Sequence, residues 1–126
     1  MARIQLVEPY ELAQWIDVDS NGIIVMDVRD SDYYGYKIPG SRNIPANQFG
    51  QNVDILIENL RKQVPTPTKI VFHCQYCRTR GPTAARLFFK KSQNILPQLE
   101  VYILNGGFDA YEQRFKNDDS KLERIY

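Results

Sequence analysis

The chain has 126 residues, a length that suits one folded domain spanning residues 1–126 and leaves no room for a second. Its apolar and charged fractions, 43% and 25%, are ordinary for a globular protein. Its net charge of +1 excludes broad electrostatic attraction to nucleic acid or to a membrane surface, so we expect neither as a partner.

The N-terminal segment MARIQLVEPYELAQWI is interrupted by charges and by a proline before any long apolar run. It therefore predicts neither a signal peptide nor a membrane span. The two cysteines, Cys74 and Cys77, are too close together to form a structural disulfide framework. Because a reactive thiol needs a reducing compartment, we expect the protein in the cytoplasm, the nucleus or both.

Strand and helix patterns alternate from the N-terminus onward. Ile4–Val7 is typical of a short strand, and Pro9 is placed to open a helix. After the turn at Asn21-Gly22, the continuous apolar run Ile23–Met26 predicts a strand buried on both faces. The next helix is indicated by apolar residues at helical spacing, and Pro65 ends it. These spaced residues are Val53, Leu56, Ile57, Leu60 and Val64.

The second half of the chain continues the alternation. The run Lys69–Phe72 predicts a buried strand, and a helix follows from Pro82 to about Gln93. Leu99–Leu104 predicts another strand, and Gly106-Gly107 turns the chain into a last helix. We expect the polar tail from Asn117 to be loosely attached. The alternation predicts an α/β fold, with a mostly parallel sheet covered by helices on both faces.

The loop between the strand at Lys69–Phe72 and the next helix carries the residues with chemistry. Ligands of parallel sheets bind beyond the carboxyl ends of strands, which is where Cys74 lies. A following helix N-terminus and nearby cations stabilise a thiolate, and a curled loop can turn its N–H groups toward an anion. Arg80 can grip two oxygens of a tetrahedral oxyanion. We therefore predict nucleophilic attack by Cys74 on an oxyanion ester through a covalent thioester intermediate.

The string HCQYCRTRGP, residues 73–82, resembles the active loop of the rhodanese-fold phosphatases. This group includes cell-division-cycle dual-specificity phosphatases and small eukaryotic arsenate reductases. Its pattern is His-Cys-x5-Arg-Gly-Pro, which Cys74, Arg80, Gly81 and Pro82 match. Other stretches are similar to two rhodanese-domain landmarks, the first being Asp27-Val28-Arg29 with Ile38-Pro39-Gly40 and Asn43-Ile44-Pro45, and the second Leu104 to Tyr111.

The resemblance implies a single rhodanese-like domain with a mostly parallel five-stranded sheet. It implies that Cys74 and Arg80 are catalytic, and that no metal or cofactor is needed. The residues expected to bind the substrate, and to hold phosphate or sulfate in its place, are Gln75, Tyr76, Cys77, Arg78, Thr79 and Arg80.

Some positions depart from the family pattern. Tyr36-Lys37 stands where rhodanese domains often have Gly-His. In the cell-cycle enzymes Cys77 is usually a serine and Thr79 an acidic residue. The change at Thr79 removes one proposed general acid from the loop. Asp30 and Asp32 are candidate general acids by proximity, although solvated loop carboxylates are the better interpretation.

The neighbouring residues have structural interpretations as well. Asp27 and Arg29 are expected to form an internal ion pair that braces the loops. His73 is expected to be buried and hydrogen-bonded to backbone, since a zinc site would need a second Cys/His pair that the chain lacks. Tyrosines near the loop can line a substrate cleft or pack against the domain. They are Tyr33, Tyr34, Tyr36 and Tyr76.

Several functions fit the loop. The first is a protein phosphatase of tyrosine or dual specificity, acting on a phosphorylated protein. The second is an arsenate reductase acting on a small oxyanion, with glutathione or Cys77 supplying a further thiol. A sulfurtransferase is a third, but ordinary rhodaneses usually have one residue fewer in the loop, which would put Thr79 at its end. An inert buried cysteine, a thioredoxin-like Cys74-x-x-Cys77 pair and a catalytically dead binding module are weaker alternatives.

Overall fold

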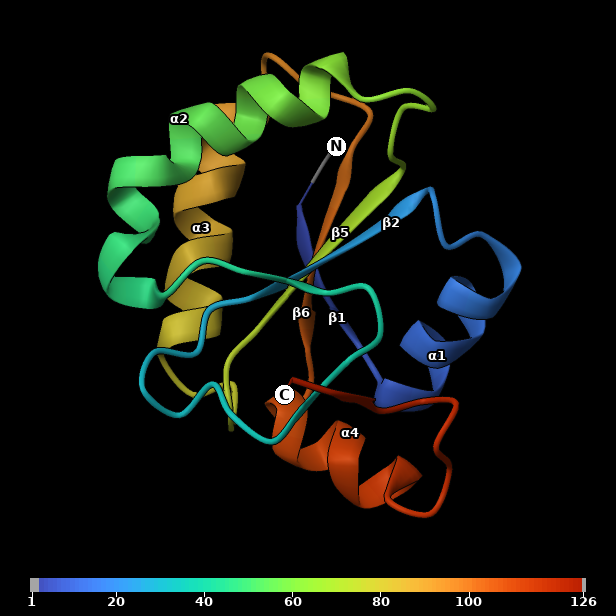
Figure 1. Ribbon diagram of the computed structural model, residues 1–126. Helices are drawn as coiled ribbons and strands as arrows, with labels where there is room; N and C mark the ends of the chain where they lie inside the picture. Colours follow the sequence, from blue (N-terminus) through green and yellow to red (C-terminus); the bar gives the residue numbers. More distant parts are fainter. Residues whose placement is uncertain (1–2, 126) are drawn as a thin grey trace.

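The computed structural model describes residues 3–125 of the chain, and Met1, Ala2 and Tyr126 lie outside this range. Its centre is a five-stranded, all-parallel sheet with the strand order β1-β6-β5-β2-β4 (Figure 1). This arrangement confirms the predicted α/β fold. In the order of the sheet, the strands are β1 (Ile4–Val7), β6 (Glu100–Leu104), β5 (Lys69–His73), β2 (Ile23–Asp27) and β4 (Arg42–Asn43).

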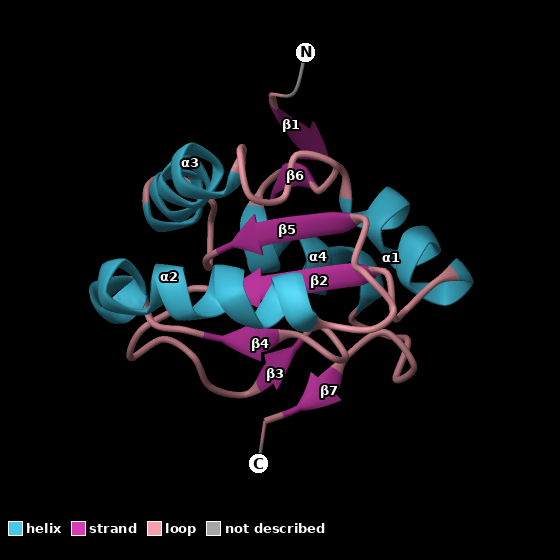
Figure 2. Ribbon diagram, turned by 90° about the horizontal axis from the view of Figure 1, so that it is seen from above, coloured by secondary structure: helices cyan, strands magenta, loops and turns pink. Residues whose placement is uncertain are grey.

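Helices cover both faces of the sheet, as predicted (Figure 2). On one face lie α2 (Ala46–Lys62) and α3 (Arg80–Ser92), and on the other α1 (Pro9–Val18) and α4 (Gly107–Phe115). Side chains alternate between two cores along the central strands, since successive residues of a strand point to opposite faces. Within residues 3–125, no helix is both long enough and apolar enough to cross a bilayer.

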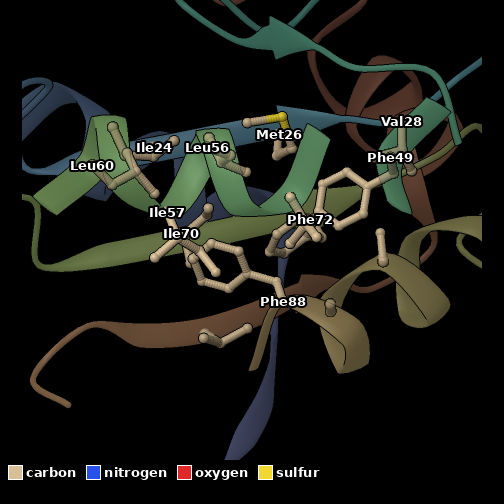
Figure 3. Packing of buried hydrophobic residues seen from close by; sticks show 14 of the residues in the cluster. Ile24, Met26, Val28, Phe49, Leu56, Ile57, Leu60, Ile70, Phe72 and Phe88 are labelled. Atoms are coloured by element: carbon tan, nitrogen blue, oxygen red, sulfur yellow. The ribbon is translucent and has the colours of Figure 1, made fainter. Parts of the chain in front are cut away.

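The core under α2 and α3 fixes the element that precedes the loop (Figure 3). The ring of Phe72, near the end of β5, lies 5.6 Å from that of Phe49 on α2 and 5.4 Å from that of Phe88 on α3. All three side chains are buried. Because this packing locks β5 against α3, the loop that joins them has both of its ends held in place.

Local signals explain most helix boundaries. Pro9 opens α1 as predicted, and the Glu11 carboxylate accepts a hydrogen bond from the N–H of Glu8 at 3.0 Å. Helix α2 ends at Lys62, before Pro65, but it begins at Ala46, earlier than its apolar pattern indicates. Its first two turns are rich in Asn, Gln and Gly, which dilute the apolar repeat.

The expectation of a loosely attached tail is wrong for the part of the tail that the structure describes. Strand β7 (Glu123–Arg124) pairs antiparallel with β3 (Tyr36–Lys37). The Tyr111 hydroxyl donates to the carbonyl oxygen of Lys121 at 2.8 Å, and the Lys121 ammonium pairs with Asp17 at 2.6 Å. These contacts join segments far apart in the sequence, so the polar composition of the tail did not reveal them.

Candidate active site

Cys74 is the first residue after β5, and its side chain is buried, with 2% exposed. Its Sγ accepts hydrogen bonds from the backbone N–H groups of Cys77, at 3.2 Å, and Gly81, at 3.3 Å. Helix α3 begins at Arg80, two residues before the predicted Pro82, so the Gly81 N–H belongs to its unpaired first turn. The sulfur therefore lies at the positive end of α3, where negative charge is stabilised.

The N-terminus of α4 holds the same loop from a second side. The N–H of Phe108 donates to the carbonyl oxygen of Cys74 at 2.9 Å, and the N–H of Asp109 donates to that of Gln75 at 2.8 Å. Gly107 permits this approach, because its φ is +65° and an added Cβ would lie 2.7 to 2.8 Å from backbone atoms of the loop. The glycine pair at the start of α4 therefore allows the close approach of the loop as well as the turn.

Cys77 has an unusual backbone and a protonated thiol. Its φ of +62° lies in the left-handed region, which is uncommon for a residue other than glycine. This conformation accompanies the hydrogen bond from its N–H to the Cys74 sulfur. Burial, together with the nearby charge of Cys74, raises the pKa of the Cys77 thiol to about 12. The Cys77 side chain is therefore a neutral thiol near pH 7.

Arg80 lies against two carboxylates from the loop after β2. Its Nη1 and Nη2 donate to the two carboxylate oxygens of Asp32 at 2.8 and 2.7 Å, and Nη1 also reaches Asp30 Oδ2 at 3.3 Å. The hydrogen bonds with Arg80 lower the pKa of Asp32, and those with Asp32 raise the pKa of Arg80. Both aspartates are thus partly exposed loop carboxylates, as interpreted, but they are paired with Arg80 and not surrounded by water alone.

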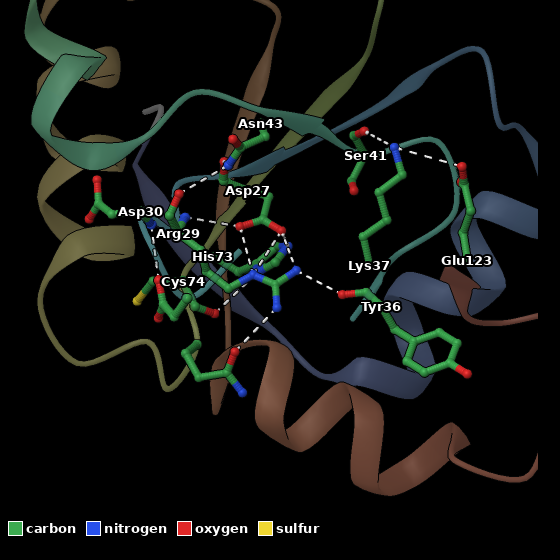
Figure 4. A network of polar contacts seen from close by, with 12 residues as sticks. Asp27, Arg29, Asp30, Tyr36, Lys37, Ser41, Asn43, His73, Cys74 and Glu123 are labelled. Carbon is green, nitrogen blue, oxygen red and sulfur yellow. Dashed lines mark hydrogen bonds and ion pairs between the residues drawn. The ribbon is translucent and has the colours of Figure 1, made fainter. Parts of the chain in front are cut away.

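Asp27 and Arg29 form the predicted internal ion pair (Figure 4). The Asp27 carboxylate accepts bonds from Nε and Nη2 of Arg29, the shortest at 2.7 Å, and the two side chains are 0% and 1% exposed. Arg29 also donates to the Gln75 side chain at 3.2 Å and to the Tyr36 carbonyl at 3.0 Å, and it lies 4.3 Å from the ring centre of Phe108. It thereby connects β2, the loop after Cys74 and α4.

The residues that depart from the family pattern take part in this bracing. Tyr36 supplies the backbone carbonyl that Arg29 binds. The Lys37 ammonium donates to the Ser41 carbonyl at 3.2 Å and lies 3.8 Å from the Glu123 carboxylate on β7 (Figure 4). Lys37 therefore ties the loop after β2 to the C-terminal segment.

His73 is completely buried beside the internal ion pair, as predicted. Its Nδ1 lies 3.1 Å from the carbonyl oxygen of Cys74, so this nitrogen carries the ring proton. Its Nε2 has no hydrogen-bond partner among the described residues and lies 3.8 Å from Asp27 Oδ2. Burial lowers the pKa of His73, and the ring is therefore neutral near pH 7.

A cavity of about 380 Å³ adjoins the loop. Its lining includes Asp32, Tyr34, Tyr36, Gln75, Tyr76 and Phe108. Three of the four candidate cleft tyrosines therefore line this cavity. The fourth, Tyr33, packs against Arg29 instead, with 5.3 Å between its ring centre and the Arg29 Cζ. A second cavity, of about 320 Å³, lies between α2 and the start of α3 and is lined in part by Thr79 and Arg80.

The structure brings some predicted loop residues to the sulfur and others to the surface. Cys77 contacts Cys74 through its backbone, whereas Gln75 binds Arg29 and Tyr76 is 56% exposed. The Arg78 guanidinium lies 5.8 Å from the ring centre of Tyr76.

Among residues 3–125, no three Cys, His, Asp or Glu side chains are grouped closely enough to hold a metal ion.

The chain matches the rhodanese-like domain family over residues 8–114. The dual specificity phosphatase ibp1 of Schizosaccharomyces pombe is 34% identical in a gapped alignment of 140 positions, which covers 98% of this chain and 99% of that protein. Arsenical-resistance protein 2 of Saccharomyces cerevisiae is 26% identical in a gapped alignment of 125 positions, which covers 94% of this chain and 96% of the relative. Other relatives are named as a CDC25-like phosphatase and an arsenate reductase.

Solved structures agree with this match. A yeast protein tyrosine phosphatase of the rhodanese family superposes with a TM-score of 0.85 at 25% sequence identity. The superposition covers 97% of this chain and 93% of the yeast protein. The likeness therefore extends over the whole sheet and its four helices.

Proposed function

The chain belongs to the rhodanese-like domain family, and on that premise we propose that it is a cysteine-dependent protein phosphatase of tyrosine or dual specificity. The observation that carries the proposal is the position of the Cys74 sulfur at the start of α3, with two backbone N–H groups directed at it. The proposed reaction needs a nucleophilic sulfur at this position, and N–H donors at the N-terminus of a helix suit a negatively charged group. The relatives named as phosphatases support the same reaction class.

In the proposed reaction, the Cys74 sulfur attacks the phosphorus of a phosphate ester and forms a phosphocysteine intermediate. The oxygens of the phosphoryl group bind to Arg80 and to N–H groups of residues 75–80. Within residues 3–125, the N–H groups of Gln75, Tyr76, Arg78 and Thr79 have no protein acceptor, so they remain available for an oxyanion. Water then releases inorganic phosphate and restores the thiolate.

Arsenate reduction is the second candidate, because relatives carry that name and arsenate matches phosphate in shape and charge. Reduction of arsenate to arsenite takes two electrons, which a pair of thiols supplies on forming a disulfide. The Cys77 thiol is a poor second partner, since its pKa is raised to about 12 and the thiolate is the reactive form. Glutathione is therefore the better reductant for this candidate.

The test is a parallel assay of p-nitrophenyl phosphate, arsenate with glutathione, and thiosulfate. We expect turnover of the phosphate ester by the wild type and loss of that turnover to background in Cys74→Ser. Cys77→Ser is the matched control, because it changes the second thiol of the same loop without touching the nucleophile. Phosphatase activity that survives in Cys74→Ser would remove Cys74 as the nucleophile, and a faster rate with arsenate would favour the second candidate.

A further inference from the structure

Asp32 binds Arg80, the residue that the proposed function assigns to anion binding, and it also lines the cavity of about 380 Å³ beside the loop. Both of its carboxylate oxygens bind the Arg80 guanidinium, and the same residue lines the cavity with Gln75 and Tyr76. The Asp32 side chain is 35% exposed, so solvent and ligand can reach it. A phosphate ester whose phosphoryl group sits on Arg80 and whose organic part sits in the cavity would have its bridging oxygen next to this carboxylate.

Asp30 differs from Asp32 although both contact Arg80. One Asp30 oxygen accepts a hydrogen bond from the N–H of Asn47, at 3.2 Å, near the start of α2. Its contact with Arg80 is a single one of 3.3 Å, and the residue is not part of the cavity lining. Asp30 therefore ties Arg80 to α2, whereas Asp32 faces the space where a substrate would enter.

The bidentate contact between Arg80 and Asp32 has the geometry that a guanidinium makes with two oxygens of a phosphate. Asp32 therefore accepts hydrogen bonds from the same Arg80 N–H groups that would bind the substrate in the proposed reaction. A phosphate dianion carries more negative charge than a carboxylate, so it competes well for the guanidinium N–H groups of Arg80. Its binding would release from Arg80 the Asp32 carboxylate, which lines the cavity.

Resting on the proposed phosphatase activity, we propose that Asp32 is the general acid and base of the reaction. On release from Arg80, its carboxylate takes one proton from solvent. As the Cys74 sulfur forms its bond to phosphorus and the bond to the leaving oxygen breaks, that oxygen receives the proton from Asp32. In the second step Asp32 accepts a proton from the attacking water, the sulfur–phosphorus bond breaks, and its electron pair returns to sulfur.

The charges around Asp32 change in the direction that this role needs. While Arg80 is bound to it, the Asp32 carboxyl has a lowered pKa, so it is ionised and cannot donate. A dianion bound to Arg80 compensates the positive charge of the guanidinium and places negative charge beside Asp32, and both changes raise a carboxyl pKa. Asp30 and Glu112 add negative charge nearby, while Arg29 is compensated by Asp27.

The experiment compares two aryl phosphates in the wild type, Asp32→Asn and Asp30→Asn. Phenolate is a poor leaving group, with a pKa of about 10 like that of tyrosine, and needs a proton, whereas p-nitrophenolate leaves readily as an anion. In Asp32→Asn we expect kcat/KM for phenyl phosphate to fall by about 10²-fold or more and that for p-nitrophenyl phosphate by less than about 10-fold. Asp30→Asn should change both esters by the same factor.

Inhibition by inorganic phosphate separates proton transfer from positioning. If Asp32 competes with the substrate for Arg80, phosphate should inhibit Asp32→Asn at least as strongly as it inhibits the wild type. Equal losses for both esters, combined with weaker phosphate inhibition, would make Asp32 a positioning residue and overturn the proposal. Failure of the wild type to hydrolyse either ester would overturn the phosphatase assignment itself, and this inference with it.

Discussion

The protein contains two arginine–aspartate ion pairs that are chemically similar but differ in how far they are buried. Asp27 and Arg29 are 0% and 1% exposed, whereas Arg80 and Asp32 are 31% and 35% exposed. Each pair has a contact of 2.7 Å, so distance does not distinguish them. Burial does, because a buried charge cannot exchange its partner for water or for a ligand at low cost.

This difference assigns the two pairs different roles. Arg29 has its remaining donors on Gln75 and the Tyr36 backbone, and it serves as a fixed connection between three parts of the fold. Arg80 is at the end of the loop, beside a cavity, with carboxylates that an incoming anion can replace. We infer that the first pair maintains the shape of the loop, whereas under the proposed function the second holds the Arg80 donors that a phosphate would take.

The largest effect should come from breaking the buried pair. Asp27→Asn leaves the buried Arg29 charge without a carboxylate to compensate it, and we expect the free energy of unfolding to fall by about 3–5 kcal/mol. Asp32→Asn is the matched control, and it should change the same quantity by less than about 1 kcal/mol, because its pair is partly exposed. Urea unfolding followed by the fluorescence of Trp15 measures both. Equal losses in the two variants would abolish the distinction between the pairs.

An intermediate effect should come from moving the loop after Cys74, which Arg29 contacts through Gln75 and which ends at Arg80. In Gly107→Ala the new Cβ meets backbone atoms of Cys74, Gln75 and Cys77, and the positive φ is strained for alanine. We expect a loss of about 1–3 kcal/mol in unfolding free energy, accompanied by weaker phosphate inhibition. Gly50→Ala on α2 is the control, since its Cβ would meet nothing within 4 Å and alanine favours a helix. Unchanged phosphate inhibition in Gly107→Ala would show that α4 does not shape the loop.

The smallest effect is a pH dependence of stability that comes from His73, the residue beside the buried pair. His73 has a lowered pKa in the folded protein, so below about pH 6.5 the unfolded chain binds a proton that the folded one does not. The stability that His73 contributes is therefore present above that pH and is lost as the pH falls. Between pH 7 and 5.5 we expect a decrease of about 1 kcal/mol.

His73→Gln is the variant that tests this dependence, because His73 is the only histidine in the chain. Urea unfolding at several pH values should give a flatter profile for His73→Gln than for the wild type. A profile equally steep in both would assign the dependence to other groups. Asp32 should not contribute in this window, since Arg80 lowers its pKa.

The residues that local patterns specify were predictable from the sequence. The apolar run before Cys74 predicted β5, and Pro9 and Pro65 indicated where helices begin and stop. The placement of Cys74 at a strand end before a helix followed from these same signals. Each depends on residues a few positions apart, because propensity, capping and periodicity act within one element.

The partners of the site depended on the tertiary structure. Asp32 and Arg80 are 48 residues apart, and they meet because parallel pairing of β2 with β5 brings their following loops to one edge of the sheet. The approach of Gly107 to the loop depends on the pairing of β6 with β5, and the position of β7 depends on its pairing with β3. Local patterns were enough to place Cys74 between a strand and a helix, whereas the charged residues around it come from pairing between distant strands, which no local pattern encodes.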